Sequence, residues 1–211
     1  MSGLFISIEG GEGVGKTVFC QRLMDQLRQD GVDAVFTREP GGTAVSQKIR
    51  EIFMNPPEGE SLEALAELYL ISAARVQHVA RLIGPALDQG RVVVCDRFYD
   101  STRVYQGELG GVSQELLEPI LTQSTGGYEP LITLLLDCDV EIAQKRLASR
   151  FTEESGNRYD DASLDFHKKL RQSYLTVAQR FPERIQVQDA SKAADEVFAG
   201  AYGVLKAYFD R

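Results

Sequence analysis

Residues 4–17, LFISIEGGEGVGKT, constrain the fold and the chemistry of this chain more than any other stretch. Their first half is apolar almost throughout and stops at two glycines, which is typical of a short buried strand. The second half fits the pattern G-x-x-x-x-G-K-[ST] at Gly10, Gly15, Lys16 and Thr17. Glycines let the backbone wrap around a polyphosphate, and a helix expected over 16–29 points the positive end of its dipole at it. The stretch therefore predicts a P-loop that binds a nucleoside triphosphate.

Three side chains are predicted to complete this phosphate site. Lys16 can reach the β and γ oxygens of the triphosphate, and Thr17 can offer its hydroxyl to Mg²⁺. Asp96 directly follows the apolar run 91–95. An aspartate at the end of such a strand positions Mg²⁺ in P-loop enzymes, usually through water. We therefore expect a nucleoside triphosphate with Mg²⁺ at this site, with Thr17 and Asp96 beside the metal.

The composition limits the classes of partner. The chain has 211 residues, 43% of them hydrophobic and 26% charged, which is ordinary for one globular domain. Its formal net charge of −8 argues against a nucleic-acid polymer as partner, because such binders carry a basic face. The three cysteines lack metal-ligand spacing and suit a reducing compartment. With neither a signal-like stretch nor an apolar run of transmembrane length, we expect a cytoplasmic protein without a membrane partner.

Strand-like and helix-like segments alternate along the chain. Strands are predicted at 4–8, 34–37, 91–95, 131–136 and 184–188. Helices are predicted at 16–29, 44–53, from 62 toward Pro85, and at 113–123, 140–149, 164–181 and 193–208. This alternation predicts an α/β fold, a doubly wound five-stranded parallel sheet with helices on both faces. Residues 150–162 are polar and lack apolar periodicity, so we expect a mobile lid there within a single domain over 1–211.

Several segments together resemble the thymidylate (dTMP) kinases of the bacterial kind, a branch of the P-loop nucleoside monophosphate kinases. They are IEGGEGVGKT at 8–17, TREPGGT at 37–43, AARVQH at 73–78, DRFYDSTRVYQG at 96–107 and LD…EIAQKRLASR…NRYDD at 136–161. The resemblance covers essentially the full length in order. TREPGGT together with DR-x-x-x-ST-x-x-YQG is specific to that family, whereas the P-loop alone is shared by many functions. The resemblance implies the reaction ATP + dTMP → ADP + dTDP and a homodimer.

The resemblance also implies which residues bind the donor. ATP would lie against Gly10, Gly11, Glu12, Gly13, Val14, Gly15, Lys16 and Thr17, with Arg146 along the adenine. Glu12 aligns with a family carboxylate expected near the 3′-hydroxyl of the acceptor and the metal. The P-loop would act with Lys16 by positioning and charge neutralisation, because phosphoryl transfer leaves the protein little covalent chemistry.

For the acceptor dTMP, the resemblance implies binding by Glu12, Arg38, Ile71, Arg75, Arg97, Ser101 and Tyr105. Arg38 and Arg97 would grip the acceptor phosphate, because planar guanidinium groups bind phosphate bidentately. Arg75 would donate to the thymine O4, and Ser101 would lie where the N3 edge of the base is read. Tyr105 would crowd the ribose 2′ position and so favour deoxyribose.

In this family the transition-state arginine comes either from the P-loop or from the lid. Position 13 here is glycine, so the P-loop supplies none. Arg150 and Arg158 are then the catalytic candidates, and Arg158 lies in the expected lid itself. Lid closure would deliver the charge and exclude water from the transferring phosphoryl group.

Two positions depart from the family pattern. The family usually has a stacking phenylalanine where this chain has Ile71, which can cover the base by apolar contact but without aromatic stacking. Val18 stands where many relatives have a second hydroxyl after GKT, and one lost hydrogen bond costs about 1 kcal/mol. Ile71 therefore affects base affinity or selectivity more than the reaction.

Two other functions stay open at this point. One is a kinase of another nucleoside monophosphate or of a deoxynucleoside, which Ile71 allows; a phosphate-free acceptor would make the Arg38 and Arg97 pair redundant. The other is a P-loop switch that hydrolyses nucleotide slowly. Against the switch, no guanine-specifying N-K-x-D run follows the fourth predicted strand. A requirement of ATP turnover for a monophosphate would separate the kinases from the switch.

Overall fold

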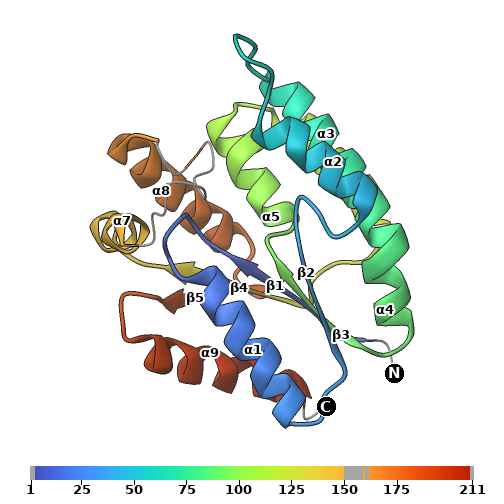
Figure 1. Ribbon diagram of the computed structural model, residues 1–211, viewed down its shortest axis with the longest axis vertical. Coiled ribbons are helices and arrows are strands. Elements are labelled where there is room, and N and C mark those ends of the chain that lie inside the picture. Colours follow the sequence, from blue (N-terminus) through green and yellow to red (C-terminus); the bar gives the residue numbers. More distant parts are fainter. Residues whose placement is uncertain (1–2, 150–158, 160–161, 210–211) are drawn as a thin grey trace.

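The computed structural model describes residues 3–149, 159 and 162–209 (Figure 1). Within them the chain forms strands β1 (Phe5–Glu9), β2 (Ala34–Arg38), β3 (Val92–Asp96), β4 (Ile132–Asp137) and β5 (Ile185–Asp189). All neighbouring strands pair in parallel, in the order β2-β3-β1-β4-β5. The strand that leads into the P-loop therefore lies at the centre of the sheet. The predicted five-stranded parallel sheet is confirmed.

The helices alternate with the strands as predicted. They are α1 (Lys16–Gln29), α2 (Ala44–Met54), α3 (Ala64–His78), α4 (Gly84–Asp88), α5 (Tyr99–Thr102), α6 (Gln114–Thr125), α7 (Val140–Ala148), α8 (Leu164–Arg180) and α9 (Ala194–Phe209). Two π-helical segments, η1 (Val79–Ile83) and η2 (Arg103–Leu109), continue α3 and α5. In the part of the chain that the structure describes, no helix combines the length and the apolar character needed to cross a membrane.

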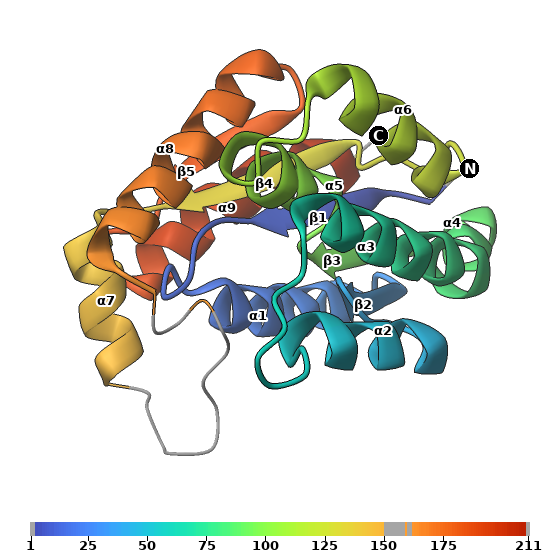
Figure 2. The same cartoon turned by 90° about the horizontal axis from the view of Figure 1, so that it is seen from above.

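Apolar cores lie on both faces of the sheet (Figure 2). Alternate residues of β1 divide between them: Ile6 and Ile8 pack with α1 and α9, whereas Phe5 packs with α3, α4 and α6. Helices α1 and α9 lie side by side. Two further residues of β1, Ser7 and Glu9, are buried polar groups. Because buried polar groups need partners, these two positions organise a polar network described below.

The helix predicted to run toward Pro85 does not end there. After α3, Gly84 donates its backbone N–H to the carbonyl of Val79, five residues back, which is the bond of a π-helix. Pro85 has no N–H and its ring would clash with the carbonyl four residues earlier in a regular helix. The wider π-turn accommodates the proline, and α4 continues to Asp88.

The carboxyl ends of three neighbouring strands carry charged residues side by side. Arg38 of β2 is in register with Asp96 of β3, and Asp96 with Ile8 of β1, which precedes Glu9. Residues after Phe98 are helical, over α5 and η2. In open parallel sheets ligands bind at this edge, so the site is expected here.

Candidate active site

The P-loop packs so closely on its neighbours that two of its positions exclude any side chain. Gly10 and Gly13 have φ of 140° and 76°, a region that L side chains rarely adopt. A Cβ at Gly13 would lie 2.3 Å from the carbonyl oxygen of Ala143 in α7, and one at Gly10 would lie 2.4 Å from that of Leu136. A side chain at position 13 of this structure would therefore require the backbone of α7 to move.

Lys16, the first residue of α1, is folded back onto the P-loop. Its Nζ donates to the carbonyl oxygens of Gly10 at 2.9 Å and Gly11 at 2.6 Å, and only 8% of the residue is exposed. Burial and the neighbouring Arg97 lower the pKa of Lys16, while Asp96 and Glu12 oppose this shift. A phosphate oxygen would offer this ammonium a stronger, charged acceptor than the two carbonyls.

A cavity of about 490 Å³ opens beside the P-loop at the carboxyl ends of the strands. The predicted site residues that line it are Glu12, Gly13, Lys16, Thr17, Arg38, Ile71, Arg75, Asp96, Arg97, Ser101 and Tyr105. These include every residue expected to bind the acceptor and both residues expected beside the metal. The fold thus brings together segments that lie far apart in the sequence. We call this space the acceptor cavity.

Arg75 forms one wall of the acceptor cavity and is held rigidly. Only 1% of the residue is exposed. Its Nε donates to Glu39 at 2.8 Å, one Nη donates to the Thr102 hydroxyl at 2.9 Å, and its guanidinium lies 5.1 Å from the centre of the Phe98 ring. The other nitrogen, Nη1, is buried without a hydrogen-bond partner among the described residues. Because a buried donor without a partner is costly, Nη1 is the group available to a ligand.

Glu39, which directly follows β2, fixes this wall. Its two carboxylate oxygens lie 2.8 Å from Arg75 Nε and 3.1 Å from the His78 ring, whose other nitrogen lies 2.7 Å from the Thr37 hydroxyl. All four groups are buried. Glu39 was missing from the predicted set although it belongs to TREPGGT. The available signal was a carboxylate directly after Arg38 within that motif.

Arg97 lines the acceptor cavity and is bound to Glu12. One Nη donates to Glu12 at 2.8 Å, and the Tyr105 hydroxyl donates to both oxygens of Glu12 at 3.1 and 2.9 Å. Burial opposes the ionisation of Glu12, but Arg97, Lys16 and Tyr105 hold its pKa below the usual value. Glu12 is therefore an anchored carboxylate between the P-loop and the acceptor cavity.

A third arginine faces the two predicted to grip phosphate. Arg50 of α2 lines the cavity and donates to the carbonyl of Pro40 at 3.0 Å. Burial lowers its pKa, and the positive charges of Arg38 and Arg97 lower it further. An incoming phosphate dianion would relieve the mutual repulsion of these three guanidinium groups. The sequence held little signal for Arg50, because a helix arginine is usually solvated.

The Ser101 hydroxyl is already bound to protein groups. It donates to Glu9 at 2.6 Å and lies 2.8 Å from the Tyr174 hydroxyl. The next residue, Thr102, has its hydroxyl 2.9 Å from Arg75, and Gln106 lines the same wall. The groups that stand next to the ligand nitrogen of Arg75 are therefore Thr102 and Gln106, which the predicted set lacked.

The expected metal site has oxygen donors in suitable positions. Asp96 Oδ1 is buried without a hydrogen-bond partner among the described residues, and Asp96 and Thr17 both line the cavity beside Lys16. Mg²⁺ takes oxygen ligands and keeps several waters, so one carboxylate, one hydroxyl and substrate phosphates fit it. Within the described ranges no group of three or more His, Cys, Asp and Glu residues is placed to hold a metal by itself.

A second cavity, of about 290 Å³, lies on the other side of the P-loop. Val14, Gly15, Val18 and Arg146 line it. Arg146 spans it to the loop after β5, donating to the carbonyl oxygen of Ala190 at 2.7 Å. Arg146 is thus fixed as a flat wall of this space, which is where a donor base would lie. The predicted Arg150 and Arg158 fall outside the described residues.

Glu9 is the most perturbed acidic group near the site, and the predicted set lacked it. Its carboxylate accepts the Phe98 backbone N–H at 2.7 Å and the Ser101 hydroxyl at 2.6 Å. Burial and the negative charge of Asp100 raise its pKa to about 7, against the hydrogen bonds and Arg97, which lower it. The only signal in the sequence was an acidic residue at the end of an apolar strand.

This pKa predicts a pH dependence of stability. The folded protein holds the Glu9 proton up to about pH 7, whereas the unfolded chain releases it near pH 4.5. The contribution of Glu9 to stability therefore falls as pH rises from 4.5 to 7, by about 3 kcal/mol. Glu9→Gln carries no ionisable group there and should lack this decline. Urea unfolding of both proteins at pH 5 and pH 8 measures it; an equal free-energy difference at the two pH values would contradict the assignment.

Comparisons with known proteins agree with this geometry. The model of the Thymidylate kinase family matches residues 8–200. A thymidylate kinase from Desulfosudis oleivorans is 45% identical over 198 residues, which are 92% of each chain. One from Desulfovibrio desulfuricans is 42% identical over 99% of this chain and 97% of its own. The crystal structure of thymidylate kinase from Ehrlichia chaffeensis superposes with a TM-score of 0.76 at 28% identity, covering 97% of this chain and 99% of that one.

Proposed function

Because this chain belongs to the thymidylate kinase family, we propose that it transfers the γ-phosphoryl group of ATP to dTMP and forms dTDP and ADP. The observation that carries this proposal is the acceptor cavity, in which the P-loop lysine, three arginines and an unpaired donor of Arg75 converge. Such a space fits one monophosphate of a small base, held next to the triphosphate site.

Arg38, Arg50 and Arg97 would bind the acceptor phosphate and align it with the donor. Positioning and charge neutralisation are the main demands of phosphoryl transfer, and guanidinium groups meet both. At the other end of the cavity, Arg75 Nη1 would donate to the thymine O4. Thymine N3–H is a donor, and the Ser101 oxygen already accepts from Arg97 and Tyr174. Thr102 and Gln106 are therefore proposed to read the N3 edge instead, Gln106 through Oε1, which is buried without a partner among the described residues.

On the donor side, Lys16 would move from its two carbonyl partners to the β and γ oxygens of ATP. The adenine would lie along Arg146 in the second cavity. Mg²⁺ bound near Thr17 and Asp96 would neutralise phosphate charge when present. Tyr105 and Glu12, linked by their hydrogen bonds, would enclose the ribose of the acceptor, with Tyr105 disfavouring a 2′-hydroxyl.

We also propose that the chain is a single kinase domain with a lid over about 150–162 and that it forms a homodimer. Apolar side chains stay exposed on adjacent helices, at Val45 and Ile52 of α2 and at Leu65, Tyr69 and Val76 of α3. The three on α3 recur at helical spacing and form one stripe, as a two-fold contact surface requires. Three buried thiols without disulfides suit a cytoplasmic, reducing location.

The test of the proposed function is ADP production with ATP and Mg²⁺, with dTMP, dUMP, dCMP, dGMP, AMP and UMP offered separately. Strong turnover with dTMP alone is the expected result. A preference for another monophosphate would keep the donor site and change the acceptor. Turnover that needs no acceptor would contradict the kinase and indicate the P-loop switch.

Ile71 and Phe53 give a prediction about how the base is covered. Both line the acceptor cavity, Phe53 from α2 and Ile71 from α3, and both are buried. We expect Phe53 to supply the aromatic surface that Ile71 lacks. Ile71→Phe should then change dTMP affinity less than twofold, whereas Phe53→Leu should weaken it about fivefold, or about 1 kcal/mol.

The same pair provides its own control. In the Phe53→Leu background, Ile71→Phe should restore most of the lost affinity, because the new phenyl ring has room there and supplies the aromatic contact that Phe53 no longer makes. Calorimetric titration of dTMP into the four proteins measures this coupling. A severalfold gain from Ile71→Phe in the parent chain would show instead that no other group covers the base.

A further inference from the structure

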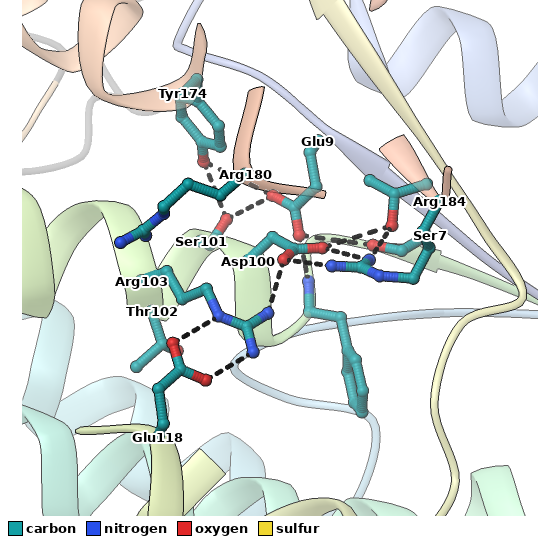
Figure 3. A network of polar contacts seen from close by, with 12 residues as sticks. Ser7, Glu9, Asp100, Ser101, Thr102, Arg103, Glu118, Tyr174, Arg180 and Arg184 are labelled. Carbon is teal, nitrogen blue, oxygen red and sulfur yellow. Dashed lines mark hydrogen bonds and ion pairs between the residues drawn. The ribbon is translucent and has the colours of Figure 1, made fainter. Parts of the chain in front are cut away.

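Tyr174 of α8 touches the reaction machinery without facing the acceptor cavity. Its hydroxyl accepts from Arg97 Nη1 at 2.6 Å. The same hydroxyl lies 2.8 Å from that of Ser101, a contact drawn in Figure 3. The residue is 3% exposed, and its ring packs in the core with Leu135, Leu170 and Val177. It does not line the acceptor cavity. Tyr174 therefore acts on the cavity through residues that line it, and its shortest hydrogen bond among them is to Arg97.

The donors of Arg97 can be counted. A guanidinium has five N–H groups in a fixed plane. Nη1 uses its two on Tyr174 and on Ser101, at 2.6 and 3.2 Å, and Nη2 uses one on Glu12 at 2.8 Å. Within the described part of the chain this leaves the Nε hydrogen and one on Nη2, which lie along the same edge. That edge is the one that binds two phosphate oxygens at once.

Arg97, Tyr174, Ser101 and Glu9 are linked by a series of hydrogen bonds, and the residues at its two ends fix the direction of each bond. Arg97 can only donate, and an ionised Glu9 can only accept. The Ser101 hydroxyl donates to Glu9 at 2.6 Å, so it accepts in its 2.8 Å contact with Tyr174. The Tyr174 hydroxyl accepts from Arg97 and donates to Ser101, with Glu9 Oε2 as a second, longer acceptor at 3.4 Å. The chain Arg97–Tyr174–Ser101–Glu9 therefore leaves Arg97 Nη1 in a single orientation.

Glu9 also fixes the backbone beside Arg97. It accepts the Phe98 N–H at 2.7 Å, while the Arg97 N–H donates to the Ile8 carbonyl at 2.9 Å. Between these bonds Arg97 has φ of 67°, a conformation that a residue with a long side chain seldom adopts. Backbone and side chain are thus both anchored to the end of β1.

From these contacts we infer that Tyr174 is a positioning residue: its hydroxyl, in series with Ser101 and Glu9, turns Arg97 so that its Nε and Nη2 edge faces the phosphate of the acceptor. The inference rests on the proposed function, since it assigns that phosphate to Arg97. It also gives Ser101 a role other than base recognition. Because Tyr174 lies on α8, it ties the helix that follows residues 150–162 to the phosphate-binding arginine.

The experiment compares two acceptor-site ligands that differ only in the phosphate. Binding of dTMP and of thymidine is measured by calorimetry at pH 8, where Glu9 is ionised, for the parent chain and Tyr174→Phe. The variant keeps the buried ring and loses the hydroxyl. We expect dTMP affinity to fall about tenfold, as for the loss of a hydrogen bond to a charged group, and thymidine affinity to stay unchanged.

Two further variants separate positioning from a general loss of structure. Tyr128→Phe removes a hydroxyl whose bonds of 3.0 Å go to the exposed Asp88, and it should change neither affinity. In an Arg97→Ala background, Tyr174→Phe should have no further effect on dTMP. If Tyr174→Phe folds poorly, Ser101→Ala replaces it in the experiment. That variant should also lose dTMP affinity and keep thymidine affinity.

Each alternative outcome has a distinct meaning. Equal losses for dTMP and thymidine would overturn the inference and leave Tyr174 a structural residue. A loss that persists without Arg97 would also overturn it, because the hydroxyl would then act by another route. Failure of the parent chain to bind dTMP, with another monophosphate bound instead, would overturn the proposed function rather than the orientation of Arg97.

Discussion

Lys16→Ala is expected to lower kcat for phosphoryl transfer at least about 10³-fold while the protein stays folded. The ammonium is buried against the P-loop carbonyls and next to Asp96, where a charge acts through a poorly solvated medium. Removing a single electrostatic stabiliser of a transition state costs about 10²–10³ in rate, and in the proposed function this lysine contacts the transferring group itself. Coupled-assay kinetics with ATP and dTMP measure the change.

Lys48→Ala is the matched control for this variant. Lys48 lies on α2, 78% of its side chain is exposed, and it pairs only with Glu51 at the surface. An exposed pair contributes little, so kcat should stay within twofold. Circular dichroism and thermal unfolding of both variants establish that the fold is kept. Normal turnover by folded Lys16→Ala would remove the P-loop from the mechanism.

Arg158→Ala is expected to lower kcat about 10³-fold with little change in the dissociation constant of dTMP. An arginine that acts on the charge of the transition state is worth this much in phosphoryl transfer. The P-loop does not provide it, because position 13 is a glycine that packs against Ala143 of α7. Rapid-quench kinetics and calorimetry together separate the chemical step from binding.

Arg150→Ala tests the second candidate in the same assays, and a smaller loss of kcat is expected because Arg150 precedes the central part of the predicted lid. Arg28→Ala, which alters a side chain that is 76% exposed at the end of α1, is the control for the loss of one positive charge. A loss of dTMP affinity as large as the loss of kcat would reassign Arg158 to substrate binding.

The sequence predicted the parts of the fold and the site that depend on short-range patterns. Helix α1 begins at Lys16 and ends at Gln29 as predicted, because the P-loop glycines and Gly31 mark its limits. Helix α2 begins at Ala44 as predicted, directly after Thr43, whose hydroxyl accepts the Ser46 N–H as an N-terminal cap. The continuation of α3 through Pro85 was not predicted, because a π-turn depends on packing that a local pattern does not record.

The residues missed in the site share one property: each acts through a partner distant in the sequence. Arg50 interacts with the charges of Arg38 and Arg97, and the Thr102 hydroxyl accepts from Arg75. The Tyr174 hydroxyl accepts from Arg97 at 2.6 Å, although the two residues are 77 positions apart. A helix arginine or a core tyrosine looks ordinary in the sequence, since nothing local distinguishes it from a solvated or apolar-core residue.

By itself the sequence determined the phosphate-binding loop, the parallel α/β architecture, the kinase family and many of the residues that line the acceptor cavity. These depend on glycine conformations, apolar periodicity and motif spacing, all of which are local. The tertiary structure alone decided which donor of Arg75 is left unpaired, how closely Gly13 packs on α7 and how Arg97 is held. Those features arise because burial makes every polar group find a partner, and the partners come from different strands and helices that meet only in the folded chain.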